Sequence, residues 1–399
     1  MTTSAPVWEC PFSQPNALEF DPALKQVAEQ APVARVRLPY GEGEAWLVTR
    51  YEEVRTVVTD QRFSRAAIIG RDFPRITPEP IVQAEAINVM DPPAYSRLRK
   101  LVAKGFTNRH VEQMRDKTQQ IADALLDTMT EHGCPADLVE HLSSQLPLRT
   151  ISEMLDIPAA DRPRLRRRAM ALMSTGVPEG QRSAKAELRA YFAELTARRR
   201  QAPADDLLSA LATAQDGGDF LDEGELAVLG MLLLVAGHDT TTNQISNLTY
   251  TLLTHPRQQA WLREHPDQLP QAIEELLRFI PFRHGVGIPR VATEDVPLGG
   301  VTIRKGEMVH VSYLTANRDA LVFERPDELE LGRPGGPHMT FGWGTHHCIG
   351  AHLARMELQV AIGTLLRRFP QLHLAVTPEQ VPWQTGSIWR SPQALPVAW

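Results

Sequence analysis

Cysteine is scarce in this sequence. Its three cysteines, Cys10, Cys134 and Cys348, lie far apart among 399 residues and form no CxxC pair. This distribution excludes a disulfide framework and a thiolate zinc site of ordinary spacing. It favours a protein of a reducing compartment.

Long apolar runs and an excess of positive charge are also missing. The most apolar segment, Leu226 to Gly237, is 12 residues long, whereas a bilayer-spanning helix needs ~20. No basic residue precedes Lys25, so the N-terminus lacks the positive region of a secretory signal. The net charge of -6 gives no global attraction to nucleic acid or to an anionic membrane. We therefore expect a cytoplasmic protein with neither partner.

Hydrophobic residues make up 43% of the chain and charged residues 23%, as in ordinary globular proteins. No repeat, low-complexity tract or linker divides the sequence. We expect one large domain over residues 1–399, with residues 1–15 as a loosely ordered N-terminal segment.

Apolar periodicity predicts a mainly α fold with small β-sheets. Alternating β-branched residues at 33–38 and 45–50 predict a small sheet near the N-terminus, and residues 96–254 carry one helical pattern after another. The proline-free stretch 221–254 predicts a long helix that crosses the molecule. A helix at 270–280, strands within 291–313, a helix at 348–369 and a strand-like tail follow.

The candidate chemistry converges on a glycine-rich loop that ends at Cys348. A cysteine where a loop becomes a helix faces free amide N–H groups and the positive end of the helix dipole, which stabilise a thiolate. Such a thiolate can bind a soft metal. The loop alone leaves three other interpretations open: a zinc site with His346, His347 and His352, a catalytic cysteine, or an inert buried cysteine.

The pattern F-G-x-G-x-H-x-C-x-G in this loop resembles the haem-binding loop of the cytochrome P450 family. It consists of Phe341, Gly342, Gly344, His346, Cys348 and Gly350. Upstream, Glu275 and Arg278 match the E-x-x-R pair of that family, and their spacing places both on one helix face. The resemblance implies a structural role for this pair, with Arg325 or Arg333 as its further arginine partner.

A third match is AGHDTT, residues 236–241, inside the predicted long helix. It is similar to the oxygen-binding segment of the same family. Ala236 and Gly237 leave room beside the helix for a planar cofactor, and the Thr240 hydroxyl can bond to a preceding carbonyl. Asp239 brings a titratable group to an apolar place. The resemblance implies that Asp239 and Thr240 relay protons.

A haem also carries two propionates, which need cationic or hydrogen-bonding partners. The resemblance assigns this role to Arg99, Arg290 and His346, and arginine suits it because its planar fork binds carboxylates. Tyr95 stands where the family commonly has histidine, and it can still donate one hydrogen bond. The cofactor implied is haem b, with Cys348 as axial ligand to the iron and with Phe341, Gly350, Ala236 and Gly237 as further contacts.

The resemblance covers residues 15 to 399 and is closest to soluble bacterial, particularly actinomycete, members. It implies a haem-thiolate monooxygenase that uses O2 to hydroxylate or epoxidise a small apolar natural product of secondary metabolism. Electrons would come from NAD(P)H through a ferredoxin reductase and a ferredoxin, and we expect a monomer. A basic patch at the thiolate side would receive the ferredoxin, formed by Arg97, Lys100, Lys104, Arg109 and Arg355.

Two alternatives remain open. Residues 283–292 and 389–399 look like those of family members that couple aromatic rings, so a phenol or indole substrate would favour oxidative coupling. A haem-binding sensor without catalysis is the alternative of another class.

By analogy with the family, we also expect a substrate pocket lined by apolar residues from several segments. Its expected members are Ile68, Ile69, Phe73, Ile76, Leu233, Val286, Ile288, Ile388 and Trp389.

Overall fold

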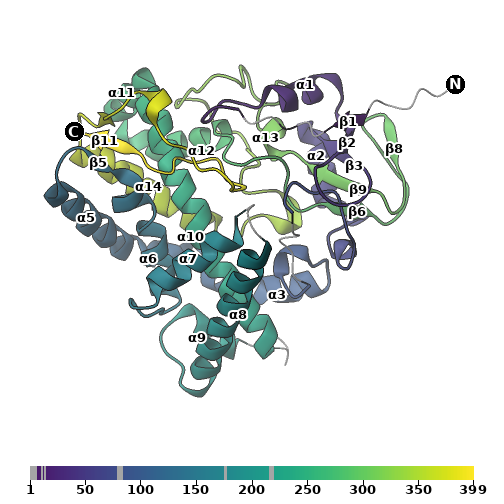
Figure 1. Ribbon diagram of the computed structural model, residues 1–399, viewed down its shortest axis with the longest axis horizontal. Coiled ribbons are helices and arrows are strands. Elements are labelled where there is room, and N and C mark those ends of the chain that lie inside the picture. Colours follow the sequence, from purple (N-terminus) through teal and green to yellow (C-terminus); the bar gives the residue numbers. More distant parts are fainter. Residues whose placement is uncertain (1–6, 10–11, 13–14, 79–83, 175–177, 215–219) are drawn as a thin grey trace.

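The structure is a computed structural model that describes residues 7–9, 12, 15–78, 84–174, 178–214 and 220–399. Helices dominate, and the strands lie in two places, most of them near the N-terminus at one side of the molecule and the others near the C-terminus at the opposite side (Figure 1). The predicted fold class, mainly α with small sheets, is confirmed. The one-domain interpretation stays a prediction. Of residues 1–15, only 7–9, 12 and 15 are described, and Val7–Glu9 form strand β1.

The helices account for most of the chain. The α-helices are α1 (Pro22–Gln30), α2 (Tyr51–Thr59), α3 (Ala94–Ala103), α4 (Asn108–Gln113), α5 (Arg115–His132), α6 (Leu146–Met154), α7 (Arg162–Leu172), α8 (Pro178–Gln201), α9 (Leu207–Thr213), α10 (Glu223–Thr254), α11 (Pro256–Glu264), α12 (Leu269–Phe279), α13 (Tyr313–Ala316) and α14 (Ala351–Arg368). Shorter helical turns are η1 (Ala66–Ile68), η2 (Ile87–Val89), η3 (Lys104–Phe106), η4 (Val139–Ser143), η5 (Pro266–Gln268), η6 (Gly344–His346) and η7 (Pro378–Gln380).

The strands form three small sheets. They are β1 (Val7–Glu9), β2 (Val33–Arg37), β3 (Ala45–Val48), β4 (Phe63–Ser64), β5 (Ala136–Asp137), β6 (Arg290–Ala292), β7 (Val296–Leu298), β8 (Val301–Ile303), β9 (Met308–Val311), β10 (His373–Leu374) and β11 (Pro396–Ala398). The largest sheet has the order β1-β2-β3-β9-β6-β4, so it joins strands of the first 64 residues to strands within residues 290–311. The two strands predicted near the N-terminus are its antiparallel β2–β3 pair.

The predicted long helix is confirmed as α10, which has 32 residues. It begins after Asp222, whose side chain accepts a hydrogen bond from the Glu225 amide while the Glu225 side chain accepts one from the Asp222 amide. This capping box satisfies amides that a helix start leaves unpaired. Helix α10 packs against α8, α6 and α14 and is buried along most of its length. It therefore runs through the interior, as in Figure 1.

None of the helices that the structure describes combines the length and apolarity that crossing a membrane requires. The longest of these helices is α10, and its neighbours in the fold bury it.

Candidate haem site

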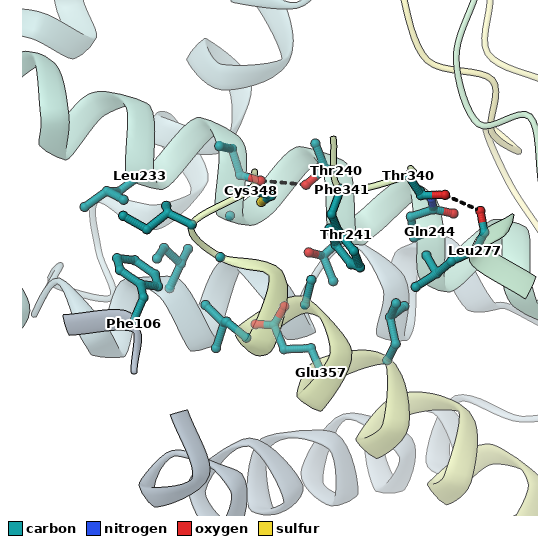
Figure 2. A pocket seen from close by; sticks show the side chains of 18 of the residues that line it. Phe106, Leu233, Thr240, Thr241, Gln244, Leu277, Thr340, Phe341, Cys348 and Glu357 are labelled. Atoms are coloured by element: carbon teal, nitrogen blue, oxygen red, sulfur yellow. Dashed lines mark hydrogen bonds between the residues drawn. The ribbon is translucent and has the colours of Figure 1, made fainter. Parts of the chain in front are cut away.

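The candidate site is a cavity of about 220 Å³ between α10 and the loop that carries Cys348. In Figure 2, α10 crosses above this loop and the first turns of α14. Cys348, Thr240 and Ala236 line the cavity together with apolar side chains such as Leu233 and Phe341. Two segments about a hundred residues apart in the sequence thus line the same cavity. A second cavity of about 180 Å³ adjoins it and shares Cys348 and Ala236.

A local backbone hydrogen bond places Cys348 just before the N-terminal end of α14. Its amide donates to the Phe341 carbonyl at 2.8 Å, and α14 begins three residues later at Ala351. The side chain is accessible, and this access is to the cavities that it lines rather than to the outer surface. Burial raises the pKa of the Cys348 thiol, while the Gly350 amide and Arg99 act in the opposite direction.

Two glycines explain the shape of this loop. Gly344 has φ +66°, and a Cβ there would lie 2.9 Å from the Val58 carbonyl oxygen, so a larger residue would strain the backbone and collide with α2. Gly350 is different, because a Cβ there would meet no described atom within 4 Å although the residue lines the cavity. A side chain at 350 would therefore project into open space, which is the space that a cofactor would need.

Across the cavity, Thr240 donates its hydroxyl hydrogen to the Ala236 carbonyl at 2.6 Å. Such back-bonding loosens a helix locally. Both Thr240 and Ala236 face the cavity. Gly237 also lines it, but its missing side chain has another cause: a Cβ there would lie 3.1 Å from Ile151 of α6. The glycine thus serves helix packing as well as the cavity.

Asp239 does not line either cavity beside Cys348, in contrast to Thr240. Its buried carboxylate accepts a 2.5 Å hydrogen bond from the Trp389 indole N–H. Burial raises the pKa of Asp239 to about 6, while the Trp389 hydrogen bond and the charge of Arg166 act in the opposite direction. Arg166, whose charge acts on this carboxylate, lies half-buried on α7.

A cluster of arginines with one histidine borders the second cavity. Arg65, Arg99 and His346 line it, and Arg290 lies beside Arg65 and His346. Arg290 is 2% exposed, yet neither of its Nη atoms has a hydrogen-bond partner. Burial and the neighbouring Arg290 lower the pKa of Arg65 to about 9. Burial and the three arginines lower the pKa of His346 to about 2. These groups fit a ligand that brings carboxylates, as a haem does.

Two residues of this cluster differ from the sequence-based expectation. Arg65 was not predicted, because it stands outside every matched motif and reaches the cluster only through the fold. Tyr95 donates its hydroxyl hydrogen to the Thr345 carbonyl at 2.5 Å, and its ring lies 4.3 Å from that of His346. Its single donor hydrogen therefore braces the loop before Cys348 instead of pointing at a propionate.

The E-x-x-R pair lies buried behind the loop. Arg278 Nε is 2.7 Å from Glu275 Oε2, and Arg333 Nε donates to Glu275 Oε1 at 3.0 Å. Arg333 is thus the further arginine of the pair. Arg325 instead pairs with the exposed residues Glu328 and Glu330. Arg278 also donates to the carbonyls of Asn317, Pro326 and Glu328, and these hydrogen bonds attach the segment 317–328 to α12.

Glu357 on α14 is a buried acid that the sequence analysis missed. It lines the cavity from below in Figure 2. Burial raises its pKa from 4.5 to about 8, and Thr150 and Thr241 offset only part of that effect. The folded state therefore holds a proton that the unfolded state releases above its own pKa of 4.5, so stability is full below about pH 4.5 and falls as the pH rises through 8.

Replacing Glu357 by glutamine should remove this pH dependence. The loss in the unmodified protein is about 1.4 kcal/mol per pH unit across that window, so Glu357→Gln should be the more stable form at pH 8.5 and nearly equal at pH 5. Urea unfolding at both pH values measures the difference. The exposed Glu264→Gln is the control, and an equal pH dependence in the protein and in Glu357→Gln would contradict the assignment.

The predicted substrate-pocket residues divide into three groups. Phe73, Ile76, Val286, Ile288, Ile388 and Trp389 line a third cavity of about 240 Å³. Leu233 lines the two cavities beside Cys348. Ile68 and Ile69 line none of these three cavities, because the tight turn η1 buries Ile68 in the core and leaves Ile69 38% exposed, so their role in a substrate pocket stays a prediction. Trp389 joins the third cavity to the first, since it lines both.

The zinc alternative for the loop is not supported. Within the described part of the chain, no three or more His, Cys, Asp or Glu side chains gather as a metal-binding group. His346, His347, Cys348 and His352 all belong to that part.

Comparisons with known proteins agree with this site. A sequence model described as Cytochrome P450 matches residues 181–393, more than half of the chain. Nocardicin C N-oxygenase of Nocardia uniformis subsp. tsuyamanensis is 49% identical over 98% of this chain and 98% of its own length. Mycinamicin IV hydroxylase/epoxidase of Micromonospora griseorubida is 45% identical over the full length of both. The crystal structure of cytochrome P450mel 107F1, described as having biaryl coupling reactivity, superposes with a TM-score of 0.96 at 63% identity, covering 99% of this chain and 100% of the other.

Proposed function

The chain belongs to the cytochrome P450 family, and we propose that it inserts oxygen from O2 into a small natural product held beside Cys348. It is a P450 monooxygenase at the general level, since its relatives are oxygenases, hydroxylases and epoxidases. The sensor alternative finds no support among them. The finer reading, hydroxylation or epoxidation of a secondary metabolite, rests on the relatives' reactions and on the apolar walls of the cavities.

The family implies a haem with a thiolate ligand. When bound, that group supplies the activation of O2. In our proposal, Cys348 Sγ holds the iron, while Arg65, Arg99, Arg290 and His346 hold the propionates. The observation that carries this proposal is the buried guanidinium of Arg290, whose two unpartnered Nη atoms lie in the same cationic cluster that borders the Cys348 cavity. A buried unpaired cation is costly unless a ligand completes it.

On the opposite side of the cavity, Thr240 and Asp239 would transfer protons. Thr240 Oγ1 faces the cavity and donates its hydrogen bond to the Ala236 carbonyl. It can donate this hydrogen instead to an acceptor that enters the cavity. We propose that Asp239 carries protons inward from the side of Arg166, because a carboxyl with a pKa of about 6 gains and loses protons readily near neutral pH. Trp389 holds that carboxylate in place through Oδ2. Apolar residues such as Leu233 and Phe282 exclude water around the substrate.

Labelled oxygen tests the proposal. With ¹⁸O₂, a reductant system and a substrate found by ligand screening, the product should carry the label. Products without label but with the mass of a dimer would favour the second candidate, oxidative coupling of aromatic rings. That candidate is supported by one specific observation, the 63% identity to a P450 with biaryl coupling reactivity.

Electrons must also reach the site, and we propose that an acidic ferredoxin delivers them. Two residues expected in the basic patch form ion pairs: Arg97 with Glu225, and Arg355 with Glu274. Lys100, Lys104 and Arg109 are exposed beside the α3 segment that supplies Arg99. Exposed charges of this kind act mainly on the association rate.

Reversing the charge of this patch should slow reduction of the protein. We expect Lys100→Glu combined with Lys104→Glu to lower the rate of reduction by a ferredoxin and to flatten its dependence on salt, while substrate affinity stays the same. Stopped-flow measurements at several ionic strengths check this. Lys305→Glu, an exposed site on the β8–β9 turn, is the control. A reduction rate of the unmodified protein that does not vary with salt would contradict electrostatic docking.

A further inference from the structure

The third cavity is lined by a cationic side chain, Arg283, which has no place among the proposed haem contacts. Arg283 lines this cavity together with Phe73, Ile76, Val286 and Trp389. It follows α12 and Phe282 in the chain, and its backbone forms an antiparallel bridge with Trp389. The cavity therefore combines apolar walls with one guanidinium group.

Arg283 is held in place without a counter-ion. Its Nη2 donates to the Val286 carbonyl at 2.7 Å, and its Nε has no hydrogen-bond partner. Among the described residues, no Asp or Glu forms an ion pair with it. Burial lowers the pKa of Arg283 to about 10, which still leaves the group charged at neutral pH. The remaining access of its side chain is to the cavity, since the residue lies deep in the protein.

The other polar groups of this cavity do not neutralise that charge. Burial lowers the pKa of His310 to about 4, so the imidazole is neutral at pH 7. Arg75 already has a partner, because it pairs with Asp72 and donates to the Pro78 carbonyl. The field in the cavity is therefore positive, and a buried positive charge of this kind favours an anionic ligand.

Aromatic rings stand next to the guanidinium. Its Cζ lies 5.8 Å from the centre of the Trp389 ring, and that ring stacks on Phe282 with 5.5 Å between centres and 14° between planes. Trp389 also lines the cavity beside Cys348. A flat ligand that contacts Trp389 would thus lie between Arg283 and the proposed reacting space.

We propose that Arg283 is the recognition site for an acidic oxygen on an aromatic substrate, either a carboxylate or a phenol. This inference rests on the proposed function, because it names the substrate class of the same site. The guanidinium fork would bind the acidic oxygen through charge-assisted hydrogen bonds, while Trp389 and the apolar walls contact the ring system. Polyphenols and aromatic acids belong to this class, whereas neutral aliphatic compounds do not.

Matched probe pairs test the inference on the haem-loaded protein by calorimetry. The first pair is 2-naphthoate and 2-naphthamide, and the second is 2-naphthol and 2-methoxynaphthalene. In at least one pair the acidic probe should bind about 10-fold or more tightly than its neutral partner, as a hydrogen bond to a charged group allows. The pair that shows the preference distinguishes a carboxylate from a phenol.

Variants then assign the preference to one side chain. Arg283→Gln should bind both members of the pair about equally, with the affinity for the neutral probe unchanged. Arg283→Lys should keep part of the preference because it keeps the charge. Arg75→Gln is the matched control in the same cavity and should keep it fully, because Asp72 already pairs with that arginine.

Three results would overturn the inference: no preference for acid in the unmodified protein, a preference that survives in Arg283→Gln, or no binding of any of the four probes. The first and third need no variant, so a misfolded variant cannot obscure them. The haem-thiolate site on which the proposed function depends is tested separately, by the absorption spectrum of the reduced carbon monoxide complex, and oxygen insertion by the ¹⁸O₂ label. A normal thiolate spectrum without any acid preference refutes this inference alone.

Discussion

Replacing Cys348 by histidine should abolish the strongly red-shifted Soret band that a thiolate-bound haem gives in its reduced carbon monoxide complex. Among the described residues, Cys348 is the cysteine that lines the cavity between α10 and its loop, and although burial raises the pKa of its thiol, the adjacent amide of Gly350 favours the ionised form. Imidazole is a different ligand and does not donate electron density as a thiolate does. Oxidation of substrate should fall to background with the band. The absorption spectrum of the reduced protein under carbon monoxide measures the change.

The other two cysteines provide the controls. Cys134 is exposed, on the short turn before β5, and Cys10 lies outside the described residues. Cys134→Ser and Cys10→Ser should keep the red-shifted band, and Cys348→Ser should lose it. Loss of the band in either control, with retention in Cys348→Ser, would refute the assignment of the ligand.

Asp239→Asn and Thr240→Ala should leave the haem content unchanged but separate reductant consumption from product formation. Loss of a positioned proton donor commonly costs ~10²-fold or more. Thr240 faces the cavity, and Asp239 lies behind it on the side of Arg166, so each substitution interrupts a different part of the same route. The ratio of product formed to reductant consumed measures the effect, with peroxide as the expected by-product.

A third variant separates proton transfer from packing. Trp389→Phe keeps a ring to stack on Phe282 but removes the N–H that holds Asp239 Oδ2. We expect its product ratio to fall less than that of Asp239→Asn, because the carboxylate remains. If the ratio is unchanged in Asp239→Asn and in Thr240→Ala, these two residues have no part in the reaction.

Much of this site could be predicted from the sequence, because its motifs are local. Cys348 with its glycines, and Ala236 with Thr240, are each set by a few consecutive residues. The length of α10 follows from the lack of proline and from the capping residues Asp222 and Glu225. Such features need no knowledge of which segments meet in space.

The rest depends on which segments meet. Arg65 reaches the cationic cluster because η1 turns toward β6, and the same turn buries Ile68 and exposes Ile69. The choice between Arg325 and Arg333 depends on how the chain bends beside α12. Asp239 and Thr240 are neighbours in sequence, but consecutive residues of a helix point about 100° apart, so they face different surroundings. The first two outcomes have no signal in residue spacing.

The most direct test of the account is a crystal structure of the purified holoprotein with anomalous diffraction at the iron edge. We predict one iron, bonded to Sγ of Cys348 within the cavity below α10, with the carboxylates of its porphyrin against Arg65, Arg99 and Arg290. Iron bound at any other site, or a haem whose carboxylates leave the Nη atoms of Arg290 without a partner, would contradict it.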